Sequence, residues 1–205
     1  MGTLNKHKLD EYIRDYGCNI MIETGTGKGE GVTYALGFPF EKIHSIEIIE
    51  KLFNETSKNI VDPRINFLNC ESPVGLESLF KNEVKETDVV LFFLDAHFPG
   101  ADFQIDGHHY DEDLPKRLKF PLNLELEMIK KYRKGKDVMI IDDLNHHEDG
   151  PFETGNLIAR YRYFRPKYGL NGTNYIVEMF KETHDVTKDY RDQGYLIITP
   201  KEKVK

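Results

Sequence analysis

Cysteine is scarce in this sequence of 205 residues, in which only Cys18 and Cys70 occur. Two cysteines are too few for a disulfide framework, and both lie in or beside expected strands, so we interpret them as buried free thiols. Apolar runs are also short, since none approaches the roughly 18 residues that a membrane helix needs. The N-terminus lacks the apolar segment of an export signal. These absences predict a cytoplasmic protein without a membrane-spanning helix.

Basic residues are outnumbered by acidic ones. The chain has 28 lysines and arginines against 35 aspartates and glutamates, which gives a net charge of −7. This balance argues against broad, charge-driven binding of nucleic acid. The basic residues within 160–167 form either a local basic patch or the solvated face of a helix. The length and the 39% apolar share suit one domain spanning residues 1–205. The oligomeric state cannot be inferred from the sequence.

Apolar periodicity predicts five strands that alternate with helices. The strands are expected at 18–24, 42–48, 64–69, 88–95 and 137–142, and the helices at 5–16, 32–36, 50–58, 74–84 and 122–132. The unbroken apolar run within 88–95 is typical of a central strand covered on both faces. Two final strands, 175–180 and 195–199, have no helix-length segment between them and should therefore run antiparallel. The pattern predicts an α/β fold with seven strands and an antiparallel strand at its end.

Two polar stretches interrupt this pattern. The first, 96–121, is long enough to suggest a functional loop or lid, and its aromatic residues either line a substrate site or pack the loop onto the domain. The second covers 145–155 and is followed by a short predicted helix at 157–164. Both stretches follow expected strands, so both are placed where a substrate would bind.

A glycine-rich segment follows the first strand and precedes a helix. Glu23 is followed by glycine at every second position, in Gly25, Gly27 and Gly29. This arrangement is typical of a nucleotide-binding corner, where bare backbone N–H groups can contact a ligand. The spacing matches neither the dinucleotide fingerprint, which needs G-x-G-x-x-G, nor the P-loop, which needs Gly-Lys followed by Ser or Thr. A different nucleoside ligand is therefore indicated.

The segment resembles motif I of the class I S-adenosylmethionine-dependent methyltransferases. The resemblance extends over about residues 18–200 and implies a Rossmann-like, doubly wound, mostly parallel seven-stranded sheet with an antiparallel last strand and helices on both faces. It also implies a set of cofactor-binding residues. These are Glu23, Gly25, Thr26, Gly27, Gly29, Glu47, Glu71, Ser72 and Asp95. Within this set Glu47, 24 residues after Glu23, would bind the ribose hydroxyls, as a carboxylate accepting from two adjacent hydroxyls can.

Three carboxylates are expected to meet after the fourth and fifth strands, namely Asp95, Asp142 and Asp143. They would repel one another without a cation, a proton or a basic group between them. Similar carboxylates bind Mg²⁺ in a metal-dependent subset of O-methyltransferases that act on sugars and other small hydroxylated substrates. This sequence departs from that subset in having His97 two residues after Asp95. Alternatively, Asp142 and Asp143 only cap the strand and the next turn.

Histidines are concentrated in the two polar stretches, which contain five of the eight. His97 and His146 lie nearest the predicted carboxylates and are candidate general bases, since histidine titrates near neutral pH. His108 and His109 are better interpreted as solvated loop residues. A zinc site lacks a recognisable ligand spacing. We therefore take Asp95, His97 and His146 as the candidate catalytic residues.

The favoured hypothesis is an enzyme that transfers the methyl group of S-adenosylmethionine to a small-molecule acceptor, at a hydroxyl group and with assistance from Mg²⁺. Two alternatives remain open at this point. The same fold could bind the cofactor without catalysis, or a non-standard glycine loop could bind NAD in an oxidoreductase.

Overall fold

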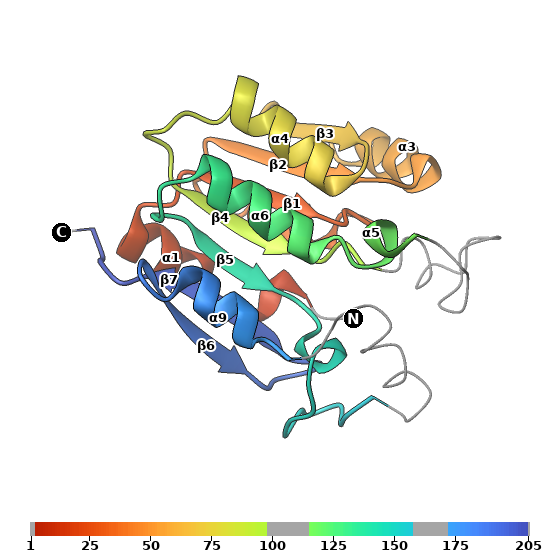
Figure 1. Cartoon of the computed structure of the whole chain (residues 1–205). Coiled ribbons are helices and arrows are strands. Elements are labelled where there is room, and N and C mark those ends of the chain that lie inside the picture. Colours follow the sequence, from red (N-terminus) through yellow and green to blue (C-terminus); the bar gives the residue numbers. More distant parts are fainter. Residues whose placement is uncertain (1–2, 98–114, 158–171, 205) are drawn as a thin grey trace.

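The computed structural model describes residues 3–97, 115–157 and 172–204, and its centre is a mixed sheet (Figure 1). The strands are β1 Ile20–Thr24, β2 Lys42–Glu47, β3 Ile65–Asn69, β4 Val90–Leu94, β5 Val138–Ile141, β6 His184–Asp189 and β7 Tyr195–Pro200. Their order is β3-β2-β1-β4-β5-β7-β6. Strands β1 to β5 pair in parallel, whereas β7 is antiparallel to both β5 and β6. The predicted seven-stranded sheet with an antiparallel last strand is confirmed.

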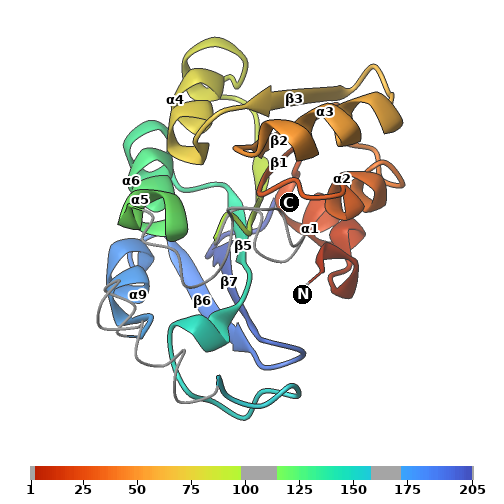
Figure 2. The same ribbon diagram turned by 90° about the vertical axis from the view of Figure 1, so that its right-hand side faces the viewer.

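Helices cover both faces of this sheet. They are α1 Leu9–Tyr16, α2 Glu30–Ala35, α3 Glu50–Asn59, α4 Ser72–Asn82, α5 Lys116–Lys119, α6 Leu122–Tyr132 and α9 Asn174–Phe180, with 3-10 turns η1 Leu4–Lys6 and η3 Leu144–His146. Helices α4, α6 and α9 lie on one face, and α1, α2 and α3 lie on the other (Figure 2). The doubly wound arrangement expected from the sequence is therefore present.

Strand β4 shows why an unbroken apolar run marks the centre of such a sheet. Its five residues are all buried. Val90, Phe92 and Leu94 pack with the helices of one face, while Leu91 and Phe93 pack with those of the other. A strand covered on both sides needs apolar residues at every position because neither alternating set meets water.

The predicted strand at 175–180 is wrong, because this segment forms helix α9. Ile176 and Phe180, four residues apart, are its buried residues, which is the spacing of one helical face. The missing strand is β6, which lies at the edge of the sheet and pairs along its whole length with β7. Its sequence, His-Asp-Val-Thr-Lys-Asp, contains too few apolar residues to predict a strand. The predicted antiparallel pairing of the last strand itself is correct.

Other differences are smaller. The leading helix begins at Leu9 and not at residue 5, since a 3-10 turn precedes it. Helix α5 was not predicted within 96–121. Residues 98–114 of that loop, and 158–164 of the helix predicted at 157–164, lie outside the described residues. Cys18 is buried, Cys70 is partly buried, and both thiols are free. None of the helices in the described ranges is long and apolar enough to cross a membrane.

Candidate functional site

The predicted site residues follow strands whose carboxyl ends meet at one edge of the sheet. Thr24, the last residue of β1, is in register with Ile46 of β2 and with Leu94 of β4. Leu94 is in turn in register with Ile141, the last residue of β5. Figure 2 views the sheet from this edge. The loops after these four strands are therefore neighbours, as binding sites of open α/β sheets require.

The loop after β1 depends on its alternating glycines. Gly25, Gly27 and Gly29 have φ angles of 84°, 52° and 77°, in the left-handed region that other residues enter at a cost of roughly 1–2 kcal/mol. A Cβ on Gly25 would also lie 2.6 Å from the backbone oxygen of Asp95. The close approach of the β1 and β4 loops thus requires glycine at this position.

Glu47, at the end of β2, connects the glycine loop to the start of α3. Its Oε2 accepts a hydrogen bond from the Gly27 N–H at 2.9 Å, and its Oε1 accepts one from the Ile49 N–H at 2.8 Å. Burial raises the pKa of this carboxyl, although both N–H groups favour its ionised form. A carboxylate offers about four acceptor positions, so each oxygen retains room for a further donor. The side chain therefore fits a ligand with two adjacent hydroxyl groups.

Glu23 lies beneath the glycine loop and is only 2% exposed. The Ser45 hydroxyl donates to Glu23 Oε2 at 2.6 Å, and the Thr26 hydroxyl lies 2.6 Å from that of Ser45. A Cβ on Gly31 would collide with Glu23 Oε1, so the first turn of α2 rests directly on the carboxyl group. Burial raises the pKa of Glu23 to about 8. Glu23 and Thr26 thus support the loop from the protein interior.

The loop after β3 supplies the remaining residues predicted to bind the cofactor. Ser72 is buried at the start of α4. Glu71 pairs with the guanidinium group of Arg117, at 3.3 Å and 3.4 Å. Arg117 belongs to α5, so this pair joins the end of the 96–121 segment to the β3 loop.

The loops after β4 and β5 bring together two carboxylates around a histidine. His97 Nδ1 lies 3.3 Å from Asp95 Oδ1, and His97 Nε2 lies 2.7 Å from Asp143 Oδ2. His146, in η3, places Nδ1 3.5 Å from the same Asp143 oxygen. Burial alone would lower the pKa of His97, but Asp143 and Asp95 together hold it well above its ordinary value. The basic group expected between the carboxylates is therefore His97.

Asp142 behaves differently from its neighbour. Its Oδ1 accepts a hydrogen bond from the Asp143 N–H at 2.7 Å, and its Oδ2 has no hydrogen-bond partner among the described residues. Burial, together with nearby Asp95 and Asp143, raises the pKa of Asp142 well above its ordinary value. By contrast, the His97 imidazole holds the pKa of Asp143 below its usual range despite burial.

The three carboxylates do not form the all-oxygen Mg²⁺ site that the resemblance implied. Within the part of the chain that the structure describes, metal-ligating atoms converge within 4.8 Å at His97, Asp143 and His146. Of the predicted ligands, only Asp143 belongs to this group. The residues present therefore do not match an oxygen-only Mg²⁺ site.

Glu125 is a residue of this site that sequence reasoning missed. It lies on α6, is 1% exposed, and burial raises its pKa to about 7. With His97, Asp143 and His146 it borders a cavity of about 20 Å³, which has room for one water molecule or ion. The available signal was a charged residue on the apolar face of a helix, next to Leu126.

Among the described residues, His147 does not belong to the convergent group. His147 is buried beside the cavity, and burial lowers its pKa to about 3. His108 and His109 lie outside the described residues.

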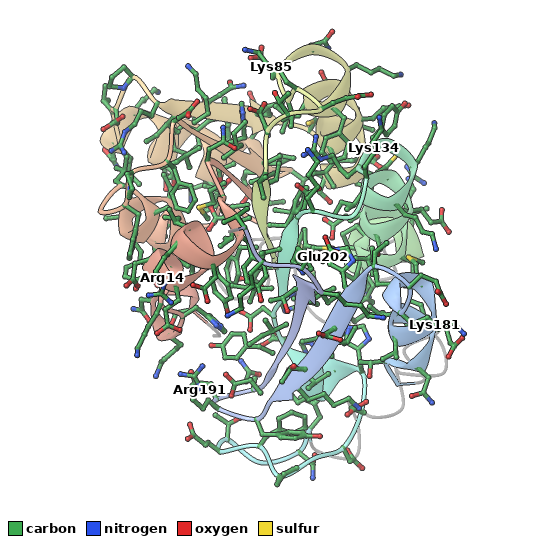
Figure 3. All side chains as sticks on the ribbon, turned by 90° about the vertical axis from the view of Figure 1, so that its left-hand side faces the viewer. Arg14, Lys85, Lys134, Lys181, Arg191 and Glu202 are labelled. Carbon is green, nitrogen blue, oxygen red and sulfur yellow. The ribbon has the colours of Figure 1, made fainter. Side chains whose placement is uncertain are left out.

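A larger cavity, of about 290 Å³, lies near the opposite edge of the sheet, between α6 and α9. Figure 3 views that edge, where Lys85, Lys134 and Lys181 are exposed. Charged groups of this cavity have partners: Arg133 is bound to Asp137 at 2.8 Å, Lys134 to Glu86 at 2.9 Å, and Lys130 donates to the Met179 carbonyl at 2.7 Å. The chemistry-bearing side chains are thus concentrated at the smaller cavity.

No model of a known protein family matches the sequence, and no curated protein matches it either. Solved structures do resemble it. A candidate caffeoyl-CoA O-methyltransferase from Staphylococcus aureus is 13% identical, with a TM-score of 0.61 over 94% of this chain and 80% of that one. A candidate methyltransferase from Streptococcus mutans, in complex with S-adenosylhomocysteine, is 10% identical, with a TM-score of 0.54 over 91% and 89% of the two chains.

A methyltransferase from Podospora anserina, also bound to S-adenosylhomocysteine, is 16% identical, with a TM-score of 0.53 over 90% of this chain and 72% of that one. At these identities the likeness concerns the fold. The chain therefore has the Rossmann-like fold of the methyltransferases, with the strand order described above.

Proposed function

We propose that this protein is a methyltransferase that uses S-adenosylmethionine to methylate a hydroxyl group of a small-molecule acceptor. One observation carries the proposal: a carboxylate suited to a diol, Glu47, lies on the same edge of the sheet as the pair formed by His97 and Asp143. A nucleoside site and a group of acid–base residues are thus adjacent, as methyl transfer between two bound molecules requires.

The cofactor would be held by backbone and side chains of four loops. Glu47 would accept hydrogen bonds from the ribose hydroxyls, and the β3 loop with Glu71 and Ser72 would border the adenine. The glycine loop would lie against the amino-acid portion, supported from below by Glu23 and Thr26. When bound, the cofactor supplies a methyl group already activated by its sulfonium centre.

The acceptor would bind above Asp95, His97 and His146. Its hydroxyl group must lose a proton as it attacks, and these residues are among the groups at this edge that can orient the hydroxyl or accept the proton. The segment 96–121 would form the acceptor wall or lid and would help to exclude water. We also propose a cytoplasmic location and one domain for the whole chain. Mg²⁺ is left out because the carboxylates do not converge as an oxygen-only site.

The NAD-dependent alternative is disfavoured by topology. Dinucleotide-binding sheets have the order 3-2-1-4-5-6. Here the antiparallel strand β7 lies between β5 and β6. The third glycine of the dinucleotide fingerprint is also missing, since counting from Gly25 places Glu30 there. The non-catalytic alternative shares every feature of the cofactor site and differs only in turnover.

Calorimetric titrations with S-adenosylhomocysteine, S-adenosylmethionine and NAD test the cofactor. We expect one site for each of the first two and none for NAD; binding of NAD alone would overturn the proposal.

Turnover is tested by measuring S-adenosylhomocysteine formation with sugars, phenols and aliphatic alcohols as acceptors. His97→Gln should reduce the rate while leaving S-adenosylhomocysteine affinity unchanged. Cofactor binding without turnover across this panel would favour the non-catalytic alternative.

A further inference from the structure

Two imidazoles and a carboxylate converge at the ends of β4 and β5. His97 follows β4, Asp143 directly follows Asp142 at the end of β5, and His146 lies in η3. Their ligating atoms are all within 4.8 Å of one another. Asp143 Oδ2 lies between the two rings, at 2.7 Å from His97 Nε2 and 3.5 Å from His146 Nδ1.

The two separations to Asp143 Oδ2 are close to the distances between two ligand atoms that bind the same metal ion. With metal–ligand distances of about 2.1 Å, two ligand atoms are about 3.0 Å apart at a 90° angle and about 3.4 Å apart at a tetrahedral angle. The two measured separations to Asp143 lie within a few tenths of an ångström of that interval. The third separation, between the two imidazole nitrogens, is within 4.8 Å.

A buried oxygen of the group has no hydrogen-bond partner in the described part of the chain. The Asp143 side chain is 8% exposed, and its Oδ1 makes no hydrogen bond with the described residues. The side chain borders the cavity of about 20 Å³. A buried carboxylate oxygen without a donor costs free energy, whereas a cation in this cavity would satisfy it.

The neighbouring carboxylates hold the ligands in place. Asp95 Oδ1 lies 3.3 Å from Nδ1 of His97, so it orients the ring with Nε2 directed toward Asp143. Asp142 Oδ1 accepts the backbone N–H of Asp143 at 2.7 Å, at a residue whose φ of 53° is unusual outside glycine. A carboxylate behind a ligating histidine is typical of metal sites, where it fixes the ring orientation.

We infer that His97, Asp143 and His146 form a binding site for a divalent transition-metal ion such as Zn²⁺, Co²⁺ or Fe²⁺. Imidazole nitrogens favour these ions, whereas Mg²⁺ favours oxygen ligands. Three protein ligands leave at least one coordination position open, as in catalytic sites. Placing the acceptor hydroxyl at an open position rests on the proposed function, but the binding of the ion does not.

The test uses the full chain after treatment with a chelator. Co²⁺ titration followed by visible absorption, and Zn²⁺ titration in competition with a chromophoric chelator, should each show one site. Mg²⁺ should bind at least about 100-fold more weakly, given the ligand set. Equal affinity for Mg²⁺ and Zn²⁺ would overturn the assignment.

Variants identify the ligands. Loss of a group that only supports a metal ligand typically weakens metal binding by about 10-fold to 100-fold. Asp95→Asn should weaken Zn²⁺ binding by this amount. His97→Ala and His146→Ala, which remove ligands, should each weaken it by more. His44→Gln, at a buried histidine of β2, is the matched control and should leave affinity unchanged. Unaltered Zn²⁺ affinity in both His97→Ala and His146→Ala would refute the site.

Folding and function are separated within the same samples. Thermal unfolding establishes whether each variant is folded, and His97→Gln replaces any His97→Ala protein that is not. S-adenosylhomocysteine binding is measured in parallel with metal binding. Failure of the unaltered protein to bind Zn²⁺ or Co²⁺, with intact cofactor binding and methyl transfer, would refute only the metal site. Metal binding without cofactor binding would refute only the proposed function.

Discussion

Replacement of Glu47 by alanine should abolish most of the affinity for S-adenosylhomocysteine. Each oxygen of this carboxylate already accepts one backbone N–H, from Ile49 and from Gly27, and has a remaining acceptor position for a ribose hydroxyl. A hydrogen bond to a charged group contributes about 1.5–3 kcal/mol. Two such bonds amount to about 3–6 kcal/mol, so we expect affinity to fall by at least about 100-fold.

The alanine variant also leaves two backbone N–H groups without their acceptor, which could disturb the glycine loop by itself. A second ligand separates the two effects. 2′-Deoxy-S-adenosylhomocysteine lacks one of the hydroxyl groups and should bind the unaltered protein about 10-fold to 100-fold more weakly. Replacing Glu47 should reduce the affinity for the deoxy ligand much less than the affinity for S-adenosylhomocysteine.

Calorimetry with both ligands and both proteins therefore forms a double-mutant cycle. A coupling of at least about 1 kcal/mol between Glu47 and the 2′-hydroxyl is expected if they are in contact. Equal losses for the two ligands would refute the ribose role and leave Glu47 as a support of the loop. Chemical unfolding of both proteins checks that the alanine variant remains folded.

Two further predictions concern other parts of the chain. Gly25→Ala should destabilise the protein by more than about 2 kcal/mol and prevent cofactor binding, since φ is 84° and the new Cβ would lie 2.6 Å from the Asp95 carbonyl oxygen. Gly155→Ala is the control, because Gly155 has a φ of 79° but open space around the position of a Cβ. If urea unfolding showed the same loss of stability for both variants, contact with Asp95 would not be its cause. His7 is buried against the Tyr195 ring, and burial lowers its pKa to about 4. In the unfolded chain the same imidazole binds its proton near pH 6.5, so the free energy of unfolding should fall as pH drops from about 6.5 to 4. His7→Phe should therefore move the midpoint of acid unfolding, measured by circular dichroism, to lower pH. An unchanged midpoint would contradict this explanation.

The local sequence pattern predicted the structure correctly where only one conformation or environment could explain it. The apolar run of β4 required a strand covered on both faces, and both hydrophobic clusters include it. The alternating glycines required left-handed backbone, which all three adopt. Pattern failed for 175–180, because a short apolar segment fits helix and strand equally until its packing partner is known. It failed also for β6, an edge strand with few apolar residues that is recognised by its pairing with β7.

The sequence by itself determined the order of elements and the strand ends at which Glu47, Asp95 and Asp143 lie, because strand periodicity and loop position are local properties. Only the tertiary structure decided which side chains meet. The parallel register of β4 and β5 brings His97 to Asp143, and the turn of η3 brings His146 to the same oxygen. Three carboxylates expected as one group are thereby divided between a ligating role for Asp143 and supporting roles for Asp95 and Asp142. Their division depends on side-chain direction across neighbouring loops, which residue spacing along a chain does not specify.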